Sequence, residues 1–368
     1  MMTTQDKPDS SVRLRPLAFE DGPAISALSE QNGMGKLDLP GWRAIWEDYP
    51  LASDFQDVAA GWVLSNDAGQ VFGYLGNVHQ MYESGGVLLK AAIATGWVVE
   101  AGQRGKSLQL VMAFYKQKGV DLYINGSANG SATRILTGFK IPRIPIPDYA
   151  SPCFWAVRPQ AFAKAVLRRK AVPGAGLLSW LAGPAIWVRD AARGSGRGRQ
   201  SVAVERWTSF EAGLDDHWLR LSAAVPRLRA VRTAAVLEWR FGADLRAGRA
   251  ILLVAGPRLR PLGYAVLMRR DAAEMGLEMM DIADIQAVGD DREVFTSLIL
   301  ASIAMTRKEG ADALKFISGT PAKRRPALAL KPYSYQLPFW QLYCKTAASV
   351  SVDLSSADDW DFSLFDTY

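Results

Sequence analysis

The feature that most constrains the fold is an apolar, strand-like run that ends in a small, glycine-bearing turn and leads into a helix. Residues 91–99 are mostly apolar, the turn reads E-A-G-Q-R-G-K, and a segment with an apolar face begins at about Lys106. A helix that opens directly after a strand leaves backbone N–H groups unpaired in its first turn, and these groups favour an anion. The pattern therefore predicts a strand–turn–helix unit whose turn can hold a pyrophosphate.

Three residues of this turn suit such a ligand. Gly105 lets the backbone approach phosphate oxygens because it has no side chain. Arg104 and Lys106 can add positive charge beside a diphosphate and a further phosphate. The same residues also fit an exposed basic turn that binds nothing, so the turn alone leaves both interpretations open.

The remainder of the first half predicts an α+β unit with a mixed, mostly antiparallel sheet. The order is strand, two helices, three strands, helix, strand, helix, strand, and the expected segments are 12–16, 19–31, 41–49, 60–65, 71–81, 87–99, 106–118, 120–124, 129–137 and 154–157. This order differs from the strict alternation of a doubly wound fold.

The second half of the chain repeats the order of strands and helices predicted for the first half more than it repeats its residues. Its expected strands are 202–207, 250–255, 262–268, 277–285 and 313–317, and its expected helices are 214–223, 233–241 and 291–308. We interpret this as an internal duplication of the fold. The chain then divides into a disordered leader (1–11), an N-terminal domain (12–160), a connector (161–200), a C-terminal domain (201–350) and an acidic tail (351–368).

The positive charge of the chain is concentrated in the connector. Residues 158–200 hold nine basic side chains and one acidic side chain, a net charge of +8, so the remainder of the chain carries −2 of the total of +6. Within this region residues 171–188 are uncharged and include Trp180 and Trp187. A connector packed between the domains is one interpretation, and peripheral contact with a membrane surface is another. Two prolines and three glycines argue against a membrane span.

The composition argues against several other classes of protein. The two cysteines, Cys153 and Cys344, are far apart and read as reduced thiols, not as a disulfide framework. Because the chain has only His79 and His217, no metal site is expected. Residues 1–11 lack the apolar stretch of a secretory signal, which favours a cytoplasmic location. Nucleic acid is not an expected partner, since one basic cluster is weak evidence.

Together with a second segment, the turn resembles the GNAT (Gcn5-related N-acetyltransferase) superfamily. That family carries roughly V-x-P-x-x-R-G-x-G/A and, later, an Asn-led helix that runs into Gly-Phe. The matching residues here are Val99, Arg104, Gly105, Asn129, Gly138 and Phe139. The resemblance covers about residues 12–157 and implies an acyl-CoA site between the fourth and fifth strands. The residues it assigns to acyl-CoA are Trp97, Val98, Val99, Gln103, Arg104, Gly105, Lys106, Ser107, Leu108 and Asn129.

The departures from the family pattern affect protonation of the leaving thiolate more than they affect phosphate binding. Ala101 replaces the proline, Gly102 stands where Gln or Arg usually opens the motif, and Ser107 replaces the last small residue. Ser107 is still expected to offer its N–H. Arg134 stands where many members have the tyrosine that protonates the departing thiolate. Another group must do this, or the thiolate leaves unaided.

An amine acceptor must lose a proton before it attacks a thioester. His79, Glu83 and Glu100 are the candidate bases, because each lies near a predicted strand end. His79 also fits an imidazole packed within the sheet, and Glu100 also fits a solvated charge. A backbone N–H near Val99 is expected to polarise the thioester carbonyl.

The second half reads as a degenerate copy. Its turn is V-G-D-D-R-E, and the aspartates Asp290 and Asp291 would repel a pyrophosphate by about 1–4 kcal/mol for each pair of charges at about 4 Å. We therefore assign no CoA to this domain and expect it to support the fold and recognise the acceptor. The tryptophans Trp42, Trp46, Trp239 and Trp340 could stack on a sugar, although core or interface packing is favoured. The tail, with Asp358, Asp359, Asp361 and Asp366, is expected to be solvated or to dock on the connector through Trp360 and Phe362.

These observations predict an N-acyltransferase that moves an acyl group from acetyl-CoA, or another acyl-CoA, to a primary amine of a small molecule. Paired units of this kind resemble transferases that act on amino sugars. One alternative is a Fem-like transferase that uses aminoacyl-tRNA, for which the basic connector is suited. The other is a non-catalytic binding module with the same fold. The oligomeric state is not predicted.

Overall fold

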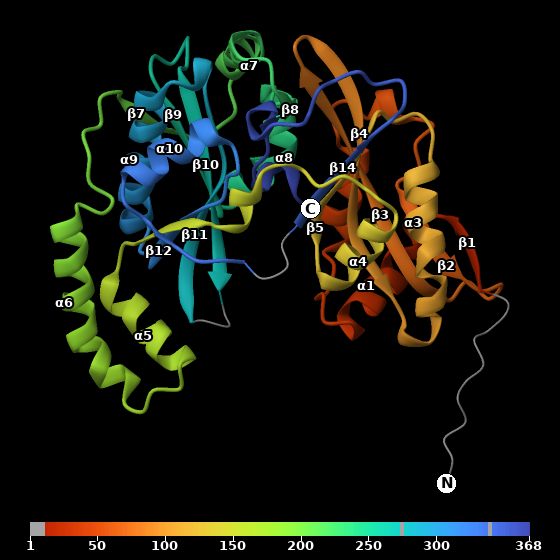
Figure 1. Cartoon of the computed structure of the whole chain (residues 1–368), viewed down its shortest axis with the longest axis horizontal. Helices are drawn as coiled ribbons and strands as arrows, with labels where there is room; N and C mark the ends of the chain where they lie inside the picture. The colour runs from red at the N-terminus through yellow and green to blue at the C-terminus, as the bar shows by residue number, and fades with distance from the viewer. Residues whose placement is uncertain (1–11, 273–275, 338–340) are drawn as a thin grey trace.

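A computed structural model describes residues 12–272, 276–337 and 341–368, and these form two mixed sheets flanked by helices (Figure 1). Both the α+β class and the tandem arrangement of two similar units are confirmed. The expected leader, residues 1–11, lies outside the described residues.

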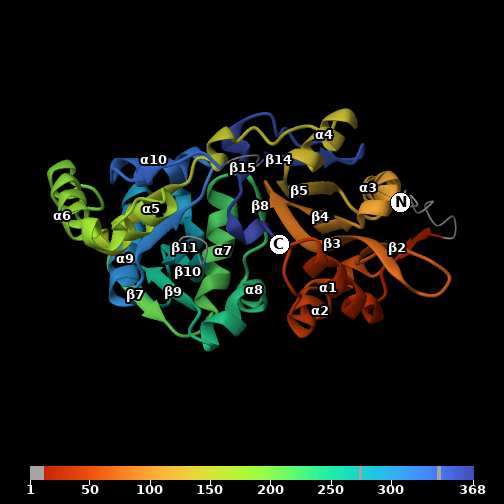
Figure 2. The ribbon, with the colours of Figure 1, turned by 90° about the horizontal axis from the view of Figure 1, so that it is seen from below.

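The first sheet is built mainly from the N-terminal half. Its strand order is β1-β2-β3-β4-β5-β14, and only β4 and β5 of this path run parallel. The strands are β1 (Arg13–Pro16), β2 (Gly61–Ser65), β3 (Val71–Ser84), β4 (Val87–Val99), β5 (Leu122–Ala128) and β14 (Gln341–Thr346). Helices α1 (Gly22–Gln31) and α2 (Leu39–Glu47) cover one face, and α3 (Ser107–Lys116) and α4 (Gly130–Gly138) lie over the other (Figure 2).

The second sheet has the same plan. Its order is β13-β6-β12-β11-β10-β9-β7, and β11 and β12 are its parallel pair. The strands are β6 (Cys153–Ala156), β7 (Val204–Trp207), β9 (Ala250–Ala255), β10 (Gly263–Ala272), β11 (Leu277–Ala287), β12 (Ala313–Phe316) and β13 (Tyr333–Ser334). The helices are α7 (Gly213–Ala224), α8 (Ala234–Arg246), α9 (Arg292–Lys308) and α10 (Pro321–Ala329).

The two sheets exchange a strand. The strand predicted at 154–157 exists as β6, but it pairs antiparallel with β12 of the second sheet. The expectation that it closes the first unit was therefore wrong. The edge beside β5 is taken instead by β14, from the C-terminal half. Neither sheet is complete without a strand from the other half of the chain, which ties the two units together.

The acidic tail is solvated only in its first part, where Asp358 is exposed, and it does not dock on the connector. Residues 360–366 are all buried, and they lie between the domains (Figure 1). The carboxylate of Asp361 pairs with Lys323, and that of Asp366 lies 3.3 Å from Arg232 Nη2. For Asp361 and Asp366 the expectation was wrong, because the aromatic and aliphatic residues beside them bury this part of the tail and basic side chains inside the second domain neutralise it.

The tryptophans mainly serve packing. Trp42 and Trp46 are buried on α2, with their ring centroids 5.3 Å apart. Trp239, on α8, lies 4.8 Å from the Tyr49 ring, and its Nε1 donates to the Ala44 carbonyl. These contacts join the second unit to the first. Trp340 lies outside the described residues.

The connector is a helical hairpin of α5 (Pro159–Arg169) and α6 (Ala175–Arg193) on the outer side of the second domain (Figure 1). Within the described residues, no helix combines the length and the hydropathy needed to cross a bilayer.

Candidate functional site

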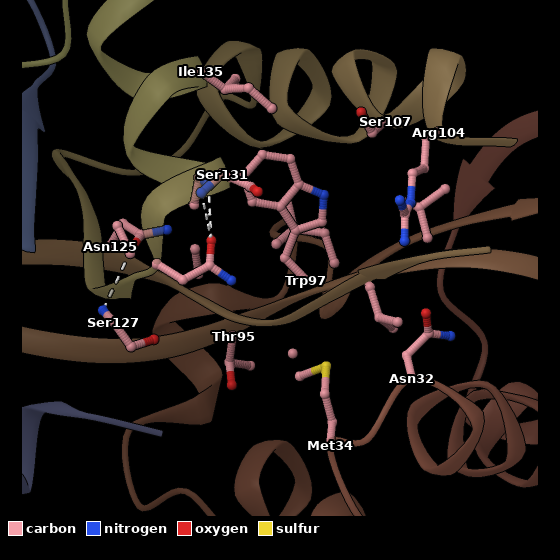
Figure 3. A pocket seen from close by; sticks show the side chains of 18 residues that line it. Asn32, Met34, Thr95, Trp97, Arg104, Ser107, Asn125, Ser127, Ser131 and Ile135 are labelled. Carbon is pink, nitrogen blue, oxygen red and sulfur yellow. Dashed lines mark hydrogen bonds between the residues drawn. The ribbon is translucent and has the colours of Figure 1, made fainter. Parts of the chain in front are cut away.

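The candidate site lies where β4 and β5 separate. The two strands pair in parallel only over Ala91–Ala94 and Leu122–Asn125. Beyond this ladder β4 continues to Val99 and β5 to Ala128 without pairing with each other. A pocket of about 590 Å³ opens at the separation, and part of its wall is the β4 segment Thr95–Val99 (Figure 3). Backbone groups on this edge of β4 have no partner on β5, so they are available to an extended ligand.

A β-bulge shapes this part of β4. Tyr74 on β3 pairs with Val98 and Gly76 pairs with Thr95, so two residues of β4, Gly96 and Trp97, lie opposite one residue of β3. Gly96 has φ of +63°, and a Cβ there would lie 2.7 Å from the Tyr74 ring. Only glycine tolerates both conditions, and a bulge of this kind bends its strand.

The predicted turn forms a short 3-10 helix, η3 (Ala101–Lys106), that leads into α3 at Ser107. The Arg104 side chain and Ser107 line one end of the pocket (Figure 3). The backbone N–H of Ser107 donates to the Arg104 carbonyl, so the expectation that this N–H is offered to a ligand was wrong. A 3-10 turn satisfies part of the helix start internally. The guanidinium of Arg104 and the hydroxyl of Ser107 are therefore the more direct anion-binding groups here.

Asn129 holds the opposite helix in place. Its Oδ1 accepts hydrogen bonds from the backbone N–H groups of Ser131 and Ala132, both at 3.0 Å, and so caps α4. Asn129, Ser131 and Ile135 then line the pocket from the α4 side (Figure 3). The residue that led the predicted helix is the N-cap, and its amide positions this wall.

The structure brings six of the ten predicted acyl-CoA residues to the pocket, namely Trp97, Val98, Val99, Arg104, Ser107 and Asn129. The other four, Gln103, Gly105, Lys106 and Leu108, do not line it. Gln103 is buried beneath the turn, and the Lys106 ammonium donates to the Val12 carbonyl at 3.0 Å. Gly105 faces open space, and Leu108 is exposed.

Several lining residues were not predicted. Asn32 and Met34 reach the pocket from the loop after α1, Thr95 from β4, and Asn125 and Ser127 from β5 (Figure 3). The N-G-S run after the fifth strand was a signal for the last two, because it places short polar side chains where β5 leaves the ladder. No comparable pattern marks Asn32 and Met34, which depend on how α1 sits against the sheet.

His79 lies away from the pocket, in the middle of β3. It pairs with Ala92, its ring stacks on Phe55, and its Nε2 lies 3.1 Å from the Ala59 carbonyl. Burial lowers the pKa of this imidazole to about 4, so it is neutral at physiological pH. These contacts fit the interpretation of His79 as an imidazole packed within the sheet.

The other two candidate bases do not line the pocket either. Glu83 lies at the far end of β3, where its carboxylate accepts from the Gly86 N–H of the β3–β4 turn. Glu100 is exposed just after β4. None of the three candidate bases is among the residues that line the pocket. On the α4 side, Arg134 is exposed with Nη2 3.5 Å from Ser131 Oγ, and the hydroxyls that reach this wall belong to Ser127 and Ser131.

The last residue of the sequence approaches the site from the second domain. Thr95 Oγ1, at the pocket, donates to the Tyr368 main-chain oxygen at 3.1 Å. Tyr368 is held by Arg240, whose guanidinium lies 4.3 Å from the centre of its ring. The C-terminal segment thus crosses from the second domain to the divergence of β4 and β5.

Comparison with known proteins agrees with this architecture. No protein-family model and no curated protein matches the sequence. Among solved structures, a GCN5-related N-acetyltransferase from Anabaena variabilis is 12% identical, with a TM-score of 0.56 over 91% of this chain and 72% of that one. Saccharomyces cerevisiae N-myristoyltransferase with bound myristoyl-CoA is 10% identical, with a TM-score of 0.56 over 97% and 87%. The chain therefore has the GNAT fold, in a tandem two-domain form.

Proposed function

We propose that this protein is an acyl-CoA-dependent N-acyltransferase whose acyl-CoA site is the pocket at the divergence of β4 and β5. The observation that carries the proposal is the unpaired edge of β4 over Thr95–Val99, which lies between a basic turn and the capped start of α4. The N-myristoyltransferase with the same fold was solved with myristoyl-CoA, and the structural match covers 87% of its chain.

The residues present fit an acyl-CoA at this place. A pantetheine arm is an extended chain of amides, and a strand edge without a neighbour offers the alternating donors and acceptors that such a chain needs. Arg104 supplies positive charge at the α3 end for the diphosphate. Gly105 leaves the backbone of the turn accessible, since nothing lies within 4 Å of where its Cβ would be.

The reaction is direct attack of an amine on the thioester carbonyl, with a backbone N–H near Val99 polarising that carbonyl. The hydroxyls of Ser127 and Ser131, which line the pocket on the α4 side, are the candidate proton donors to the departing thiolate. Deprotonation of the amine proceeds through water, because none of the candidate bases His79, Glu83 and Glu100 lines the pocket. The acceptor enters beside Asn32 and Met34.

We further propose that the donor is acetyl-CoA and that the acceptor is the primary amine of a small molecule, with amino sugars as the first class to examine. The pocket volume and the polar Asn32, Thr95 and Asn125 suit a compact, hydrogen-bonding acceptor. A cytoplasmic location fits a CoA-dependent reaction.

The test is thermal unfolding with and without acetyl-CoA, followed by thiol release across a panel of amines. A ligand at about 100 times its Kd adds ~2.7 kcal/mol to the native state, and the melting temperature rises by several degrees. Arg104→Ala should lose most of this shift, whereas Arg246→Ala, on the exposed end of α8, should keep it. Salt-dependent tRNA binding with no CoA shift would instead indicate an aminoacyl-tRNA transferase. CoA binding without thiol release would indicate a non-catalytic module.

A further inference from the structure

Helix α6 presents its large apolar side chains outward, the reverse of an ordinary surface helix. The exposed residues are Leu177 (78%), Leu178 (40%), Trp180 (67%), Leu181 (75%), Trp187 (60%) and Val188 (58%). Leu177, Leu181 and Val188 are separated by four and seven positions, so they form one stripe, and the two tryptophans, seven residues apart, flank it. Among the described helices none exposes more large apolar side chains.

The opposite side of α6 is made of small residues and faces α5. Ala175, Ser179 and Gly183 are buried there, at four-residue spacing. A Cβ on Gly183 would lie 2.8 Å from Gln160 Cα, so the two helices approach closely at this point. α5 in turn packs on the second sheet, through Ala165. The buried contacts of α6 are therefore made by its small residues, and the large apolar residues stay exposed.

Charge surrounds the apolar stripe and has one sign. Arg168, Arg169 and Lys170 end α5, just before the hairpin turn, and Arg189, Arg193, Arg197 and Arg199 follow the stripe. The single acid of residues 158–200 is Asp190, whose carboxylate accepts a hydrogen bond from the Tyr333 hydroxyl. The net charge of +8 already includes Asp190, and among the described residues Asp312 of the second domain also lies 3.6 Å from Arg158.

We propose that the outer face of α6, with the basic residues at its two ends, binds the surface of an anionic membrane. Tryptophan, leucine and valine side chains on one face insert at the level of the headgroups, and flanking cations attract anionic lipids. A second copy of the chain is the poorer occupant, because pairing two such faces would bring two groups of like charge together. The hairpin stands at the outer edge of the second domain, away from the β4–β5 pocket (Figures 1 and 2). The inference is independent of the proposed acyltransfer.

The experiment is co-sedimentation of the full chain with vesicles of phosphatidylcholine, with and without about one-third phosphatidylglycerol, at low and high salt. Binding should require the anionic lipid and weaken as salt rises, because surface charges are screened within about 10 Å at 0.1 M. A double variant, Trp180→Ser with Leu181→Ser, should bind at least about tenfold more weakly. Arg168→Glu with Lys170→Glu should abolish the preference for anionic lipid.

The matched control is Leu259→Ser, since Leu259 is even more exposed (91%) but lies between β9 and β10, outside the basic region. It should bind vesicles like the unaltered chain, and all variants should keep the thermal shift with acetyl-CoA. Vesicle binding that survives the Trp180 and Leu181 changes would overturn the proposal. So would a dimer, seen by light scattering, that becomes a monomer in that double variant, because the face would then bind a second copy.

Discussion

The two domains follow one plan up to the end of their parallel strands, and there they differ. In the first, β4 and β5 pair over four positions and β4 then runs on through Thr95–Val99; in the second, β11 and β12 pair over four positions and β11 runs on through Ala283–Ala287. A 3-10 turn and a helix follow in both. In the first domain this place is a pocket, and in the second it is filled by the chain itself.

The filling comes from the C-terminal segment. Ser363 Oγ donates to Asp284 Oδ1 on β11 at 3.1 Å, and the Thr320 hydroxyl, at the start of α10, donates to the Trp360 carbonyl at 2.9 Å. The start of α9 is also used internally, because Asp291 Oδ1 accepts from Glu293 N at 2.8 Å and Val294 N at 3.1 Å. A position in a fold is thus a ligand site only where the chain leaves its polar groups unsatisfied.

The largest expected effect on stability concerns the buried charges that the C-terminal segment contacts in the second domain. Arg232 is fully buried, with Nε 2.8 Å from Asp284 Oδ2 and Nη2 3.3 Å from Asp366 Oδ2. Arg232→Ala would leave two carboxylates buried without this partner, so we expect a loss of about 3–5 kcal/mol in the free energy of unfolding. Urea denaturation measures it. The exposed pair Arg246–Glu238 is the control, and Arg246→Ala should cost less than about 1 kcal/mol. Equal losses would show that burial of the cluster does not matter.

Each domain also holds one buried histidine, and both should make stability depend on pH. Burial lowers the pKa of His79 and of His217 to about 4, from 6.5. Between these values the unfolded chain binds protons that the folded chain does not, so stability is lost as the pH falls from 6.5 towards 4. Each histidine contributes at most about 3 kcal/mol to the loss.

The measurement is urea unfolding at pH 7 and pH 4.5, for the unaltered chain and for His79→Gln and His217→Gln. Each variant should show a smaller decrease in stability between the two pH values, even if it is less stable at pH 7. An unchanged pH dependence in both variants would place the titration on other groups.

Gly105→Glu tests the open turn of the first domain by giving it the charge that the second domain carries. The backbone there has no positive φ and the position faces open space, so the fold should be unaffected. A carboxylate about 4 Å from a phosphate costs about 1–4 kcal/mol, which is roughly 5- to 1000-fold in affinity. Calorimetric titration with acetyl-CoA measures the loss. Gly105→Gln has the same bulk without the charge and should lose far less; if the Glu variant binds normally, the acyl-CoA site lies elsewhere.

Local patterns predicted much of the fold and several residues that line the candidate site. The run to Val99, the turn at Arg104 and the helix led by Asn129 all form where expected, because each depends on neighbouring residues. The exchange of β6 and β14 could not be read in this way, since a four-residue strand such as β6 carries no mark of its partner. The burial of the tail depends on cations far away in the sequence, such as Arg232.

The smallest expected effect concerns two helix N-caps, of which only one also lines the pocket. Asn129 and Asp291 each accept two backbone N–H groups at the start of a helix, α4 in the first domain and α9 in the second. Changing either to Ala should cost about 1 kcal/mol of stability. Only Asn129 lines the pocket, so only Asn129→Ala should also reduce the thermal shift with acetyl-CoA. The shift is measured against each variant's own melting temperature, which removes the common loss of the cap. If Asp291→Ala reduced the shift equally, the ligand would depend on both domains, and the contrast between an open site and a filled one would fail.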